Sequence, residues 1–272
     1  MGEYLVRVDS APLSAHTNLK ALLANRIGRR TVLGVAPSAT GSVRDVAVLP
    51  VNAATEKGLI YRAWVEQNRA YVAKASGGKL GYVHMFDMSQ DALKQLYLDL
   101  DAENMSKEGV VIDVRNNNGG FVNAYALDVL SRQPYLVMHA RGRSAVPARS
   151  QLGQRALERP TALVVNQHTL SDGEDFTEGY EAMHLGPVIG EPTAGWIVFT
   201  SNFTLLDSTT VRIPFARITD TQGRDMEMHP RPVDVEVQRP MGASYRGSDP
   251  QLDAAVRALL SRVTAPQPFG GR

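Results

Sequence analysis

Ser171 is the residue of this chain that is best placed to act as a nucleophile. It follows a short apolar segment at 161–165 and precedes a helical pattern over 172–183, so the sequence predicts a serine at a turn between a buried strand and a helix. The first N–H groups of a helix have no partner inside the helix, and the amide of Asp172 would therefore face an oxyanion formed at this turn. Such an arrangement is typical of acyl transfer.

A purely structural role explains the same residues. Ser171 is followed three residues later by Glu174, which is the spacing of a capping box at a helix N-terminus. The segment also lacks the G-x-S-x-G pattern of the α/β-hydrolases. The local sequence therefore leaves both a nucleophile and a helix cap open.

The pair Gly119-Gly120 is a second candidate, shortly after the apolar segment 109–114. Glycines at the end of a buried strand let the backbone approach a ligand closely and present N–H groups to an anion. The pattern fits an oxyanion site, and it fits an ordinary strand–turn–helix connection equally well. No GKS, GKT or GxGxxG motif is present, so a nucleotide-phosphate cradle is not indicated.

Glu227 and His229 form a third candidate, in a loop after a predicted hairpin at 201–207 and 210–218. The carboxylate could serve a catalytic site, or both side chains could lie on a solvated turn. No HExxH motif or other spaced ligand cluster accompanies them, so the sequence predicts no metal site and no cofactor.

The elements that must position these residues alternate between strand and helix from Gly78 onward. Alternation of this kind implies an α/β fold with a mostly parallel sheet and flanking helices. The predicted strands lie at 80–85, 109–114, 135–138, 161–165 and 188–190, and the predicted helices at 89–100, 121–130, 172–183 and 249–260.

Composition excludes several classes of function. Lys and Arg number 29 and Asp and Glu 28, so the net charge of +1 gives no field that would attract nucleic acid or an anionic membrane. The absence of cysteine excludes disulfides and cysteine nucleophiles. No apolar run reaches the roughly 18 residues that a membrane-spanning helix needs. The N-terminal sequence has no signal-peptide pattern, and we expect a chain that starts within a fold.

Five segments in unbroken order resemble the tricorn-type members of the tail-specific protease superfamily. The resemblance covers about residues 78–260 and implies the crotonase-like, ClpP-like core of those serine peptidases. The segments are GKLGYVHM at 78–85, VVIDVRNNNGGFV at 110–122, the Ser171 segment at 166–175, GEPTAGW at 190–196 and MEMHPRPVDVEV at 226–237.

The N-terminal region, at residues 4–35, resembles the last part of a PDZ domain. The resemblance divides the chain into a partial PDZ-like unit at 1–36, a linker strand and helix at 37–77, and a serine peptidase catalytic domain at 78–272. The opening strands of a PDZ domain are absent, so we do not expect this unit to bind a peptide C-terminus.

The same resemblance implies roles for the candidate residues. Ser171 matches the nucleophile, and the amides of Gly120 and Asp172, with Gly119 beside them, match the oxyanion hole. Glu227 matches a glutamate that acts on the catalytic histidine through a second serine. In that family the histidine and the second serine precede the PDZ domain, so we expect both to lie upstream of this chain.

The general base is the part of the site that this sequence does not identify. A Ser–Lys dyad, as in related tail-specific proteases, is excluded because no lysine follows Lys107. The base is therefore expected to be a histidine. His229 is a candidate substitute base because it lies two residues from Glu227, although a loop histidine facing solvent fits its position better.

The resemblance thus implies a serine peptidase that hydrolyses short peptides through an acyl-enzyme at Ser171, in a cytoplasmic homo-oligomer. Without its histidine we expect the chain to be impaired. An esterase using the same serine and a non-catalytic peptide-binding fragment remain alternatives. The acid that selects basic substrates in the tricorn protease has no counterpart at 135–141, so a basic preference does not carry over and an apolar preference is expected.

Overall fold

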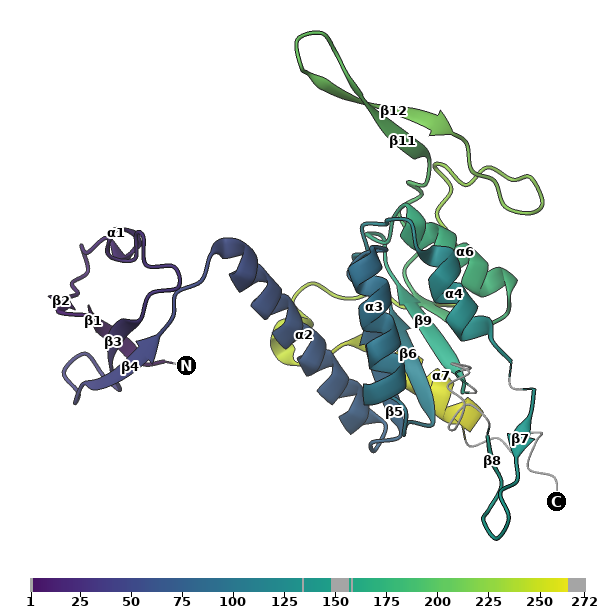
Figure 1. The fold of residues 1–272 in the computed structure, drawn as a ribbon, viewed down its shortest axis with the longest axis horizontal. Coiled ribbons are helices and arrows are strands. Elements are labelled where there is room, and N and C mark those ends of the chain that lie inside the picture. The colour runs from purple at the N-terminus through teal and green to yellow at the C-terminus, as the bar shows by residue number, and fades with distance from the viewer. Residues whose placement is uncertain (1, 134, 148–156, 158, 264–272) are drawn as a thin grey trace. The chain divides into compact units, whose positions relative to one another are not determined.

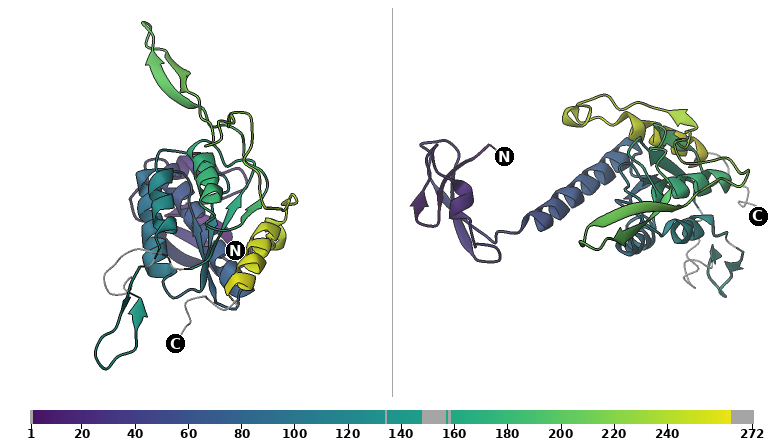
Figure 2. Two further views of the ribbon diagram at one scale, coloured as in Figure 1. Left: turned by 90° about the vertical axis from the view of Figure 1, so that its right-hand side faces the viewer. Right: turned by 90° about the horizontal axis from the view of Figure 1, so that it is seen from above.

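The structure is a computed structural model that describes residues 2–133, 135–147, 157 and 159–263 (Figures 1 and 2). The chain divides into two compact units, Met1–Trp64 and Val65–Arg272. The division falls within the long helix α2 (Ala53–Ala75). All the candidate site residues belong to the second unit.

The first unit is a small antiparallel sheet with strand order β2-β1-β3-β4. The linker strand expected after residue 36 is part of this sheet, because β4 pairs with β3 along its whole length. The relation of the unit to PDZ domains stays a prediction. Its elements are β1 (Tyr4–Val8), β2 (Ala11–Pro12), α1 (Leu19–Leu22), β3 (Thr31–Ala36) and β4 (Arg44–Val48).

The second unit is built on a five-stranded sheet with the order β13-β10-β9-β6-β5, in which every neighbouring pair is parallel. All residues of its three longest strands are buried, which is why these strands are almost continuously apolar. The predicted parallel α/β fold is confirmed. The strands are β5 (Leu80–His84), β6 (Gly109–Asp113), β9 (Thr161–Val165), β10 (Val188–Gly190) and β13 (Val235–Glu236).

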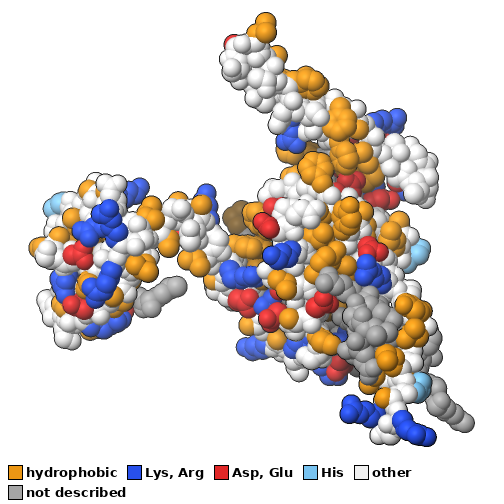
Figure 3. All heavy atoms as spheres, viewed as in Figure 1, with side chains coloured by type: hydrophobic (Ala, Val, Ile, Leu, Met, Phe, Trp, Pro, Cys, Tyr) orange, Lys and Arg blue, Asp and Glu red, His pale blue; other side chains and the backbone are white. Residues whose placement is uncertain are grey.

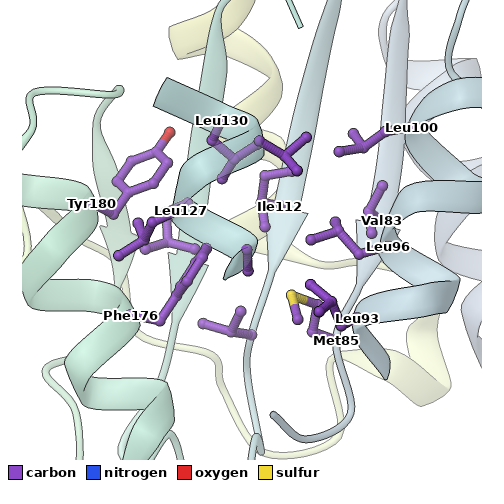
Figure 4. Close-up of a cluster of buried hydrophobic side chains, with 14 of the residues drawn as sticks. Val83, Met85, Leu93, Leu96, Leu100, Ile112, Leu127, Leu130, Phe176 and Tyr180 are labelled. Carbon is purple, nitrogen blue, oxygen red and sulfur yellow. The ribbon is translucent and has the colours of Figure 1, made fainter. Parts of the chain in front are cut away.

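Helices cover both faces of this sheet. One face packs against α3 (Gln90–Leu98), α4 (Asn123–Ser131) and α6 (Asp172–Ala182), and a single cluster of buried side chains such as Ile112, Leu127 and Phe176 fills the layer between them (Figure 4). The other face packs against α7 (Pro250–Val263). No helix within the described residues is both long and apolar enough to span a lipid bilayer.

The start of α3 follows a local sequence signal. Ser89 accepts a hydrogen bond from the Ala92 N–H at 3.2 Å and so caps α3, as its residue type predicts. The predicted helix at 89–100 continues past α3 as a π-helical segment, η1 (Asp99–Glu103). A short 3-10 turn, η2 (Ser244–Arg246), precedes α7.

The prediction of a sheet strand at 135–138 is wrong. Only β7 (Val137–Met138) is a strand there, and it pairs antiparallel with β8 (Val146–Pro147) outside the five-stranded sheet. The physical reason is exposure: Tyr135 is 77% and Val137 55% exposed, so this apolar run has no covering layer. The sheet edge is formed instead by β13, which was not predicted.

The predicted hairpin is present as β11 (Phe199–Thr204) and β12 (Thr210–Ala216), paired antiparallel and projecting from the body of the unit (Figure 1). Apolar side chains lie along its surface (Figure 3). The loop that follows β12 lies near α4 and α6, because its residues 218–221 and 226 line a cavity together with residues of these helices.

A buried ionic cluster joins the end of β6 to the start of α7. Arg115, only 1% exposed, donates to the carboxylates of Asp113 at 2.6 Å and Asp249 at 2.9 Å. Burial alone would raise the pKa of Asp113, yet the Arg115 guanidinium holds that pKa below its ordinary value. The glycine turn that follows β6 therefore starts from an electrostatically fixed position.

Replacing the guanidinium should destabilise the fold strongly. Arg115→Leu leaves the buried Asp113 carboxylate without a counter-charge, whereas Asp249 keeps an ion pair with Arg239 at 3.6 Å; loss of one partner of a buried pair typically costs about 3–5 kcal/mol. The measurement is urea unfolding followed by circular dichroism. The control is Arg132→Leu, because Arg132 forms an exposed ion pair with Asp128 and its loss should cost less than about 1 kcal/mol. Similar losses for the two variants would contradict the role of the cluster.

Candidate active site

Ser171 occupies a strained turn between β9 and α6, with φ at 55° and ψ at −129°. A residue with a side chain in such a conformation costs on the order of 1–3 kcal/mol and persists only where its surroundings hold it. Here the Ser171 N–H donates to the carbonyl of Trp196 at 2.7 Å. The turn projects the serine away from the regular path of the helix.

The capping-box interpretation of this segment is wrong. The Ser171 side chain makes no capping hydrogen bond. The Glu174 carboxylate accepts instead from the Thr193 hydroxyl at 2.6 Å, the Gly195 N–H at 2.8 Å and the Trp196 N–H at 2.7 Å. Glu174 therefore fixes the segment that holds Ser171. Within the described residues, the Ser171 hydroxyl has no hydrogen-bond partner.

The Asp172 carboxylate links the Ser171 turn to the turn after β6. It accepts from the Val122 N–H at 2.7 Å and the Asn123 N–H at 3.0 Å, and also from the Asn123 side-chain amide. These two N–H groups begin α4 and have no partner inside that helix. A carboxylate at a helix N-terminus is also favoured by the helix dipole. Asp172 thus satisfies α4 and fixes its start beside Ser171.

Gly119 lies against Ser171 and could carry no side chain there. A Cβ atom on Gly119 would lie 2.9 Å from both the Ser171 Oγ and the Asp172 nitrogen, and 2.5 Å from the Ser171 Cβ. Its φ of 80° is also one that glycine adopts at little cost. The absence of a side chain therefore allows the two turns to approach closely, with the serine hydroxyl and the Asp172 N–H beside Gly119.

Gly120 is fixed by an isolated parallel bridge to Met88. The bridge uses the flanking groups: the Met88 N–H donates to the Gly119 carbonyl and the Phe121 N–H to the Met88 carbonyl, both at 2.8 Å. The N–H of Gly120 takes part in neither of these hydrogen bonds. A Cβ on Gly120 would lie 2.1 Å from the Met88 oxygen, so this position also requires glycine.

Two backbone donors therefore remain unpaired at the junction of the two turns. Among the described residues, the N–H groups of Gly120 and Asp172 make no hydrogen bond. The Gly119 N–H, by contrast, donates to the Asn117 side chain at 2.8 Å. The N–H of Gly119, which was expected beside the two donors, is thus already engaged, and the lack of a side chain at Gly119 allows the two turns to approach closely.

Glu227 connects to the same site through the segment after Trp196. Its Oε2 accepts from the Ile197 and Val198 N–H groups, both at 2.8 Å, and the next residue, Met228, donates its N–H to the Gly195 carbonyl. The other carboxylate oxygen, Oε1, makes no hydrogen bond within the described residues. Glu227 is therefore held in place with one oxygen free to accept a further donor.

No histidine of this chain is joined to the nucleophile. His229 is exposed, and its Nδ1 lies 2.8 Å from the backbone oxygen of Glu227 rather than from the carboxylate. His84 is buried against the Arg115 carbonyl, and burial lowers its pKa. None of the described histidines forms a hydrogen bond with the Ser171 hydroxyl.

Asp175, one helical turn after Ser171, is a residue that the sequence reasoning missed. Its Oδ2 atom is buried without a hydrogen-bond partner. Burial, and then the charges of Asp172 and Glu174, raise the pKa of Asp175 to about 7. The signal available in the sequence was its position in the first turn of the helix that begins directly after the serine.

Known proteins match the chain across this region. The family model described as Peptidase family S41 matches residues 79–237. Tricorn protease homolog 1 of Streptomyces coelicolor is 35% identical over 265 residues, which cover 96% of this chain and 24% of that protein. The tricorn protease of Thermoplasma acidophilum is 29% identical over 265 residues, with 96% and 24% covered. The chain thus spans about a quarter of the length of these relatives.

A solved structure agrees with the sequence matches. The crystal structure of the tricorn protease superposes with a TM-score of 0.83 at 27% identity, covering 96% of this chain and 25% of that one. A more distant relative, the carboxyl-terminal-processing protease of Synechocystis, is 24% identical over 192 residues, which cover 69% of this chain and 44% of that protein.

The raised pKa of Asp175 should make stability depend on pH. In the unfolded chain this carboxyl ionises near its ordinary pKa of 3.8 and in the folded chain near 7, so its ionisation weakens the fold as pH rises between these values. Asp175→Asn removes that loss. At pH 8 we expect it to raise the free energy of unfolding by about 1–2 kcal/mol relative to wild type, a figure reduced for solvent screening of this partly exposed group.

Urea unfolding at pH 4 and pH 8 measures this difference, which should be near zero at pH 4. Asp128→Asn, the same change at an exposed carboxylate on α4, is the control and should show no gain at pH 8. An Asp175→Asn variant that is less stable than wild type at pH 8 would refute the interpretation that the ionised Asp175 carboxyl destabilises the fold.

Proposed function

The chain belongs to peptidase family S41, and we propose that it is the part of a serine peptidase that supplies the nucleophile and the oxyanion hole. The sequence resemblance to tricorn-type peptidases is confirmed by the comparisons. The observation that carries the proposed roles is that the N–H groups of Gly120 and Asp172 and the Ser171 hydroxyl make no hydrogen bond among the described residues, although the two turns that carry them are in contact. A substrate carbonyl bound at this junction would meet a nucleophile and two donors together.

The proposed reaction is peptide-bond hydrolysis through an acyl-enzyme. The Ser171 Oγ attacks the carbonyl carbon, and its proton passes by way of a base to the departing amine. The N–H groups of Gly120 and Asp172 stabilise the negative charge on the carbonyl oxygen. Loss of one such donor typically costs about 3–4 kcal/mol of transition-state stabilisation. Water then releases the acyl group by the reverse sequence of steps.

Glu227 is proposed to orient the base rather than to act as the base. Its Oε2 is committed to two backbone N–H groups, and its Oε1 is free to accept from a partner that carries the histidine. We assign the base to a histidine outside this sequence, because none of the described histidines contacts Ser171. His229 is the alternative within the chain, and a single variant separates the two.

The proposed substrates are peptides, since the relatives are named as proteases. Assembly with further copies of the chain and a cytoplasmic location stay expectations from the resemblance. Hydrolysis of activated esters is the second candidate function. It is favoured by one observation, that no described residue forms a hydrogen bond with the Ser171 hydroxyl, because good leaving groups depend less on proton transfer than amines do.

With imidazole added as a substitute base, Ser171 should be the only serine labelled by a fluorophosphonate probe, and the labelling should require glycine at position 119. Gly119→Ala places a Cβ against the Ser171 side chain and the Asp172 N–H, so we expect the labelling rate to fall at least about 10²-fold. Peptide mapping by mass spectrometry locates the label, and its time course gives the rate.

Gly223→Ala is the matched control for this variant. Gly223 has a φ of 81°, close to that of Gly119, but a Cβ there meets no atom within 4 Å. Gly223→Ala therefore introduces the same backbone strain as Gly119→Ala without a steric clash. Its labelling rate should equal that of wild type. Label on another serine with Ser171 untouched, or equal rates for the two alanine variants, would falsify the assignment.

Added imidazole should partly replace the missing base. A general base typically raises the reaction rate roughly 10²–10⁴-fold. We expect free imidazole to raise the rates of hydrolysis of a p-nitrophenyl ester and of a peptide about tenfold. Ser171→Ala gives the background of direct imidazole attack, which is subtracted. His229→Ala should leave both rates unchanged. Full peptide hydrolysis without imidazole that is lost in His229→Ala would instead identify His229 as the base.

A further inference from the structure

Trp196 carries a large apolar side chain that the fold leaves in solvent close to the proposed nucleophile. The residue is 63% exposed, although tryptophan is on average a strongly buried residue. Within the described part of the chain, its indole makes no hydrogen bond and no aromatic contact, and it does not belong to the core cluster. Packing of the core therefore does not explain a tryptophan at this position.

The backbone of Trp196 is held between the nucleophile and Glu227. Its carbonyl accepts the Ser171 N–H at 2.7 Å, and its own N–H donates to the Glu174 carboxylate at 2.7 Å. The next N–H along the chain, that of Ile197, donates to Glu227 at 2.8 Å. These hydrogen bonds leave the backbone little freedom, so the indole has a fixed point of attachment next to Ser171.

Met228 carries a second exposed apolar side chain, on the neighbouring segment. The residue is 74% exposed, and its N–H donates to the carbonyl of Gly195 at 2.8 Å, one residue before Trp196. A Cβ atom on Gly195 would lie 3.1 Å from the Pro230 nitrogen, so the two segments are in direct contact. The side chains of Trp196 and Met228 are therefore attached to adjoining stretches of backbone.

The backbone of Met228 has a conformation that methionine rarely adopts. Its φ is 61°, in the left-handed region that favours glycine. Strained residues of this kind persist only where their surroundings hold them, and they gather at functional sites. A methionine that is mostly exposed gains little from packing to offset the strain, which favours a role in binding.

The segment that carries Trp196 offers a ligand few backbone donors. The N–H groups of residues 195–198 are all bound to the carboxylates of Glu174 or Glu227. A ligand at this place would therefore meet side chains rather than backbone N–H groups, and its selection would depend on apolar contact.

We propose that Trp196 and Met228 form an apolar wall that binds an aromatic side chain of the peptide, from a residue next to the bond that Ser171 attacks. The proposal rests on the peptidase function proposed above and names the class of residue that the site selects. An indole and a flexible thioether both make favourable contacts with an aromatic ring. A small side chain would leave the wall in water, and a charged one would lose hydration against it.

This assignment has a different basis from the apolar preference expected from the sequence. That expectation rested on the lack of an acid at 135–141, whereas the wall consists of two exposed side chains on segments that also hold Ser171 and Glu227. Its removal should therefore change selectivity while residues 135–141 stay intact.

The test compares peptides that differ only in one side chain. Fluorescence anisotropy measures binding of labelled peptides to the 272-residue Ser171→Ala variant, which prevents turnover. Each pair carries phenylalanine or alanine, first before and then after the scissile bond. In at least one position we expect the phenylalanine peptide to bind about tenfold more tightly, because its ring leaves water and contacts the indole.

Trp196→Ala in the same background should reduce this ratio to about two, whereas Trp196→Phe, which keeps an aromatic ring, should retain most of it. Met228→Ala should lower the ratio about threefold. The matched controls are Tyr245→Ala, at a residue that is 98% exposed in η2, and Met105→Ala, at a residue that is 47% exposed in the loop before β6. Both controls should leave the ratio unchanged.

Tryptophan emission provides a second measurement that leaves the wall intact. The chain has two tryptophans, so Trp64→Phe makes Trp196 the sole one. Its emission should shift to shorter wavelength when the phenylalanine peptide binds, because the indole leaves water. Equal binding of phenylalanine and alanine peptides in both positions, a preference that survives Trp196→Ala, or an emission spectrum that bound peptide does not change would overturn the proposal.

The outcome also separates this inference from the function on which it rests. If Ser171 is labelled by fluorophosphonate in the presence of imidazole but no phenylalanine preference is found, the assignment of the wall alone is wrong. If the preference depends on Trp196 while Ser171 resists labelling, the wall stands and the peptidase proposal fails.

Discussion

The hydrogen bonds from the start of α4 to the Asp172 carboxylate are the interaction on which the proposed site depends. The strands β6 and β9 are parallel neighbours, so their carboxyl ends meet at one edge of the sheet. Adjacency alone does not fix the two turns that follow. Asp172 does so, because it accepts the N–H groups of Val122 and Asn123 while its own N–H stays unpaired beside Ser171. One residue thereby positions both halves of the proposed oxyanion hole.

Two further carboxylates act on the backbone in the same way. Glu174 holds the segment whose Trp196 carbonyl accepts the Ser171 N–H, and Glu227 holds the two residues that follow. Each acid satisfies N–H groups that would otherwise be unpaired, and the strained φ of Ser171 is maintained by these contacts. Asp175 is the exception in this region, because its carboxyl accepts no hydrogen bond from any described residue.

The sequence predicted those parts of the site that depend on local pattern. The apolar runs at 109–114 and 161–165 located the two central strands, and the residues after them located Gly119 and Ser171. It could not decide whether Ser171 caps its helix, because that depends on Glu174 reaching a segment far along the chain. It missed Asp175, since the sequence pattern does not show which carboxyls the folded chain buries. The apolar run at 135–138 led to the wrong prediction of a sheet strand, because its residues are exposed and no other element covers them.

The most direct test of the account is a crystal structure of the chain with a phosphonate bound covalently to Ser171. The phosphonyl oxygen takes the place of the oxyanion of the tetrahedral intermediate. The account predicts this oxygen at about 2.7–3.1 Å from the nitrogens of both Gly120 and Asp172. An oxygen that points to solvent, or one held by the Gly119 nitrogen after loss of its bond to Asn117, would contradict it.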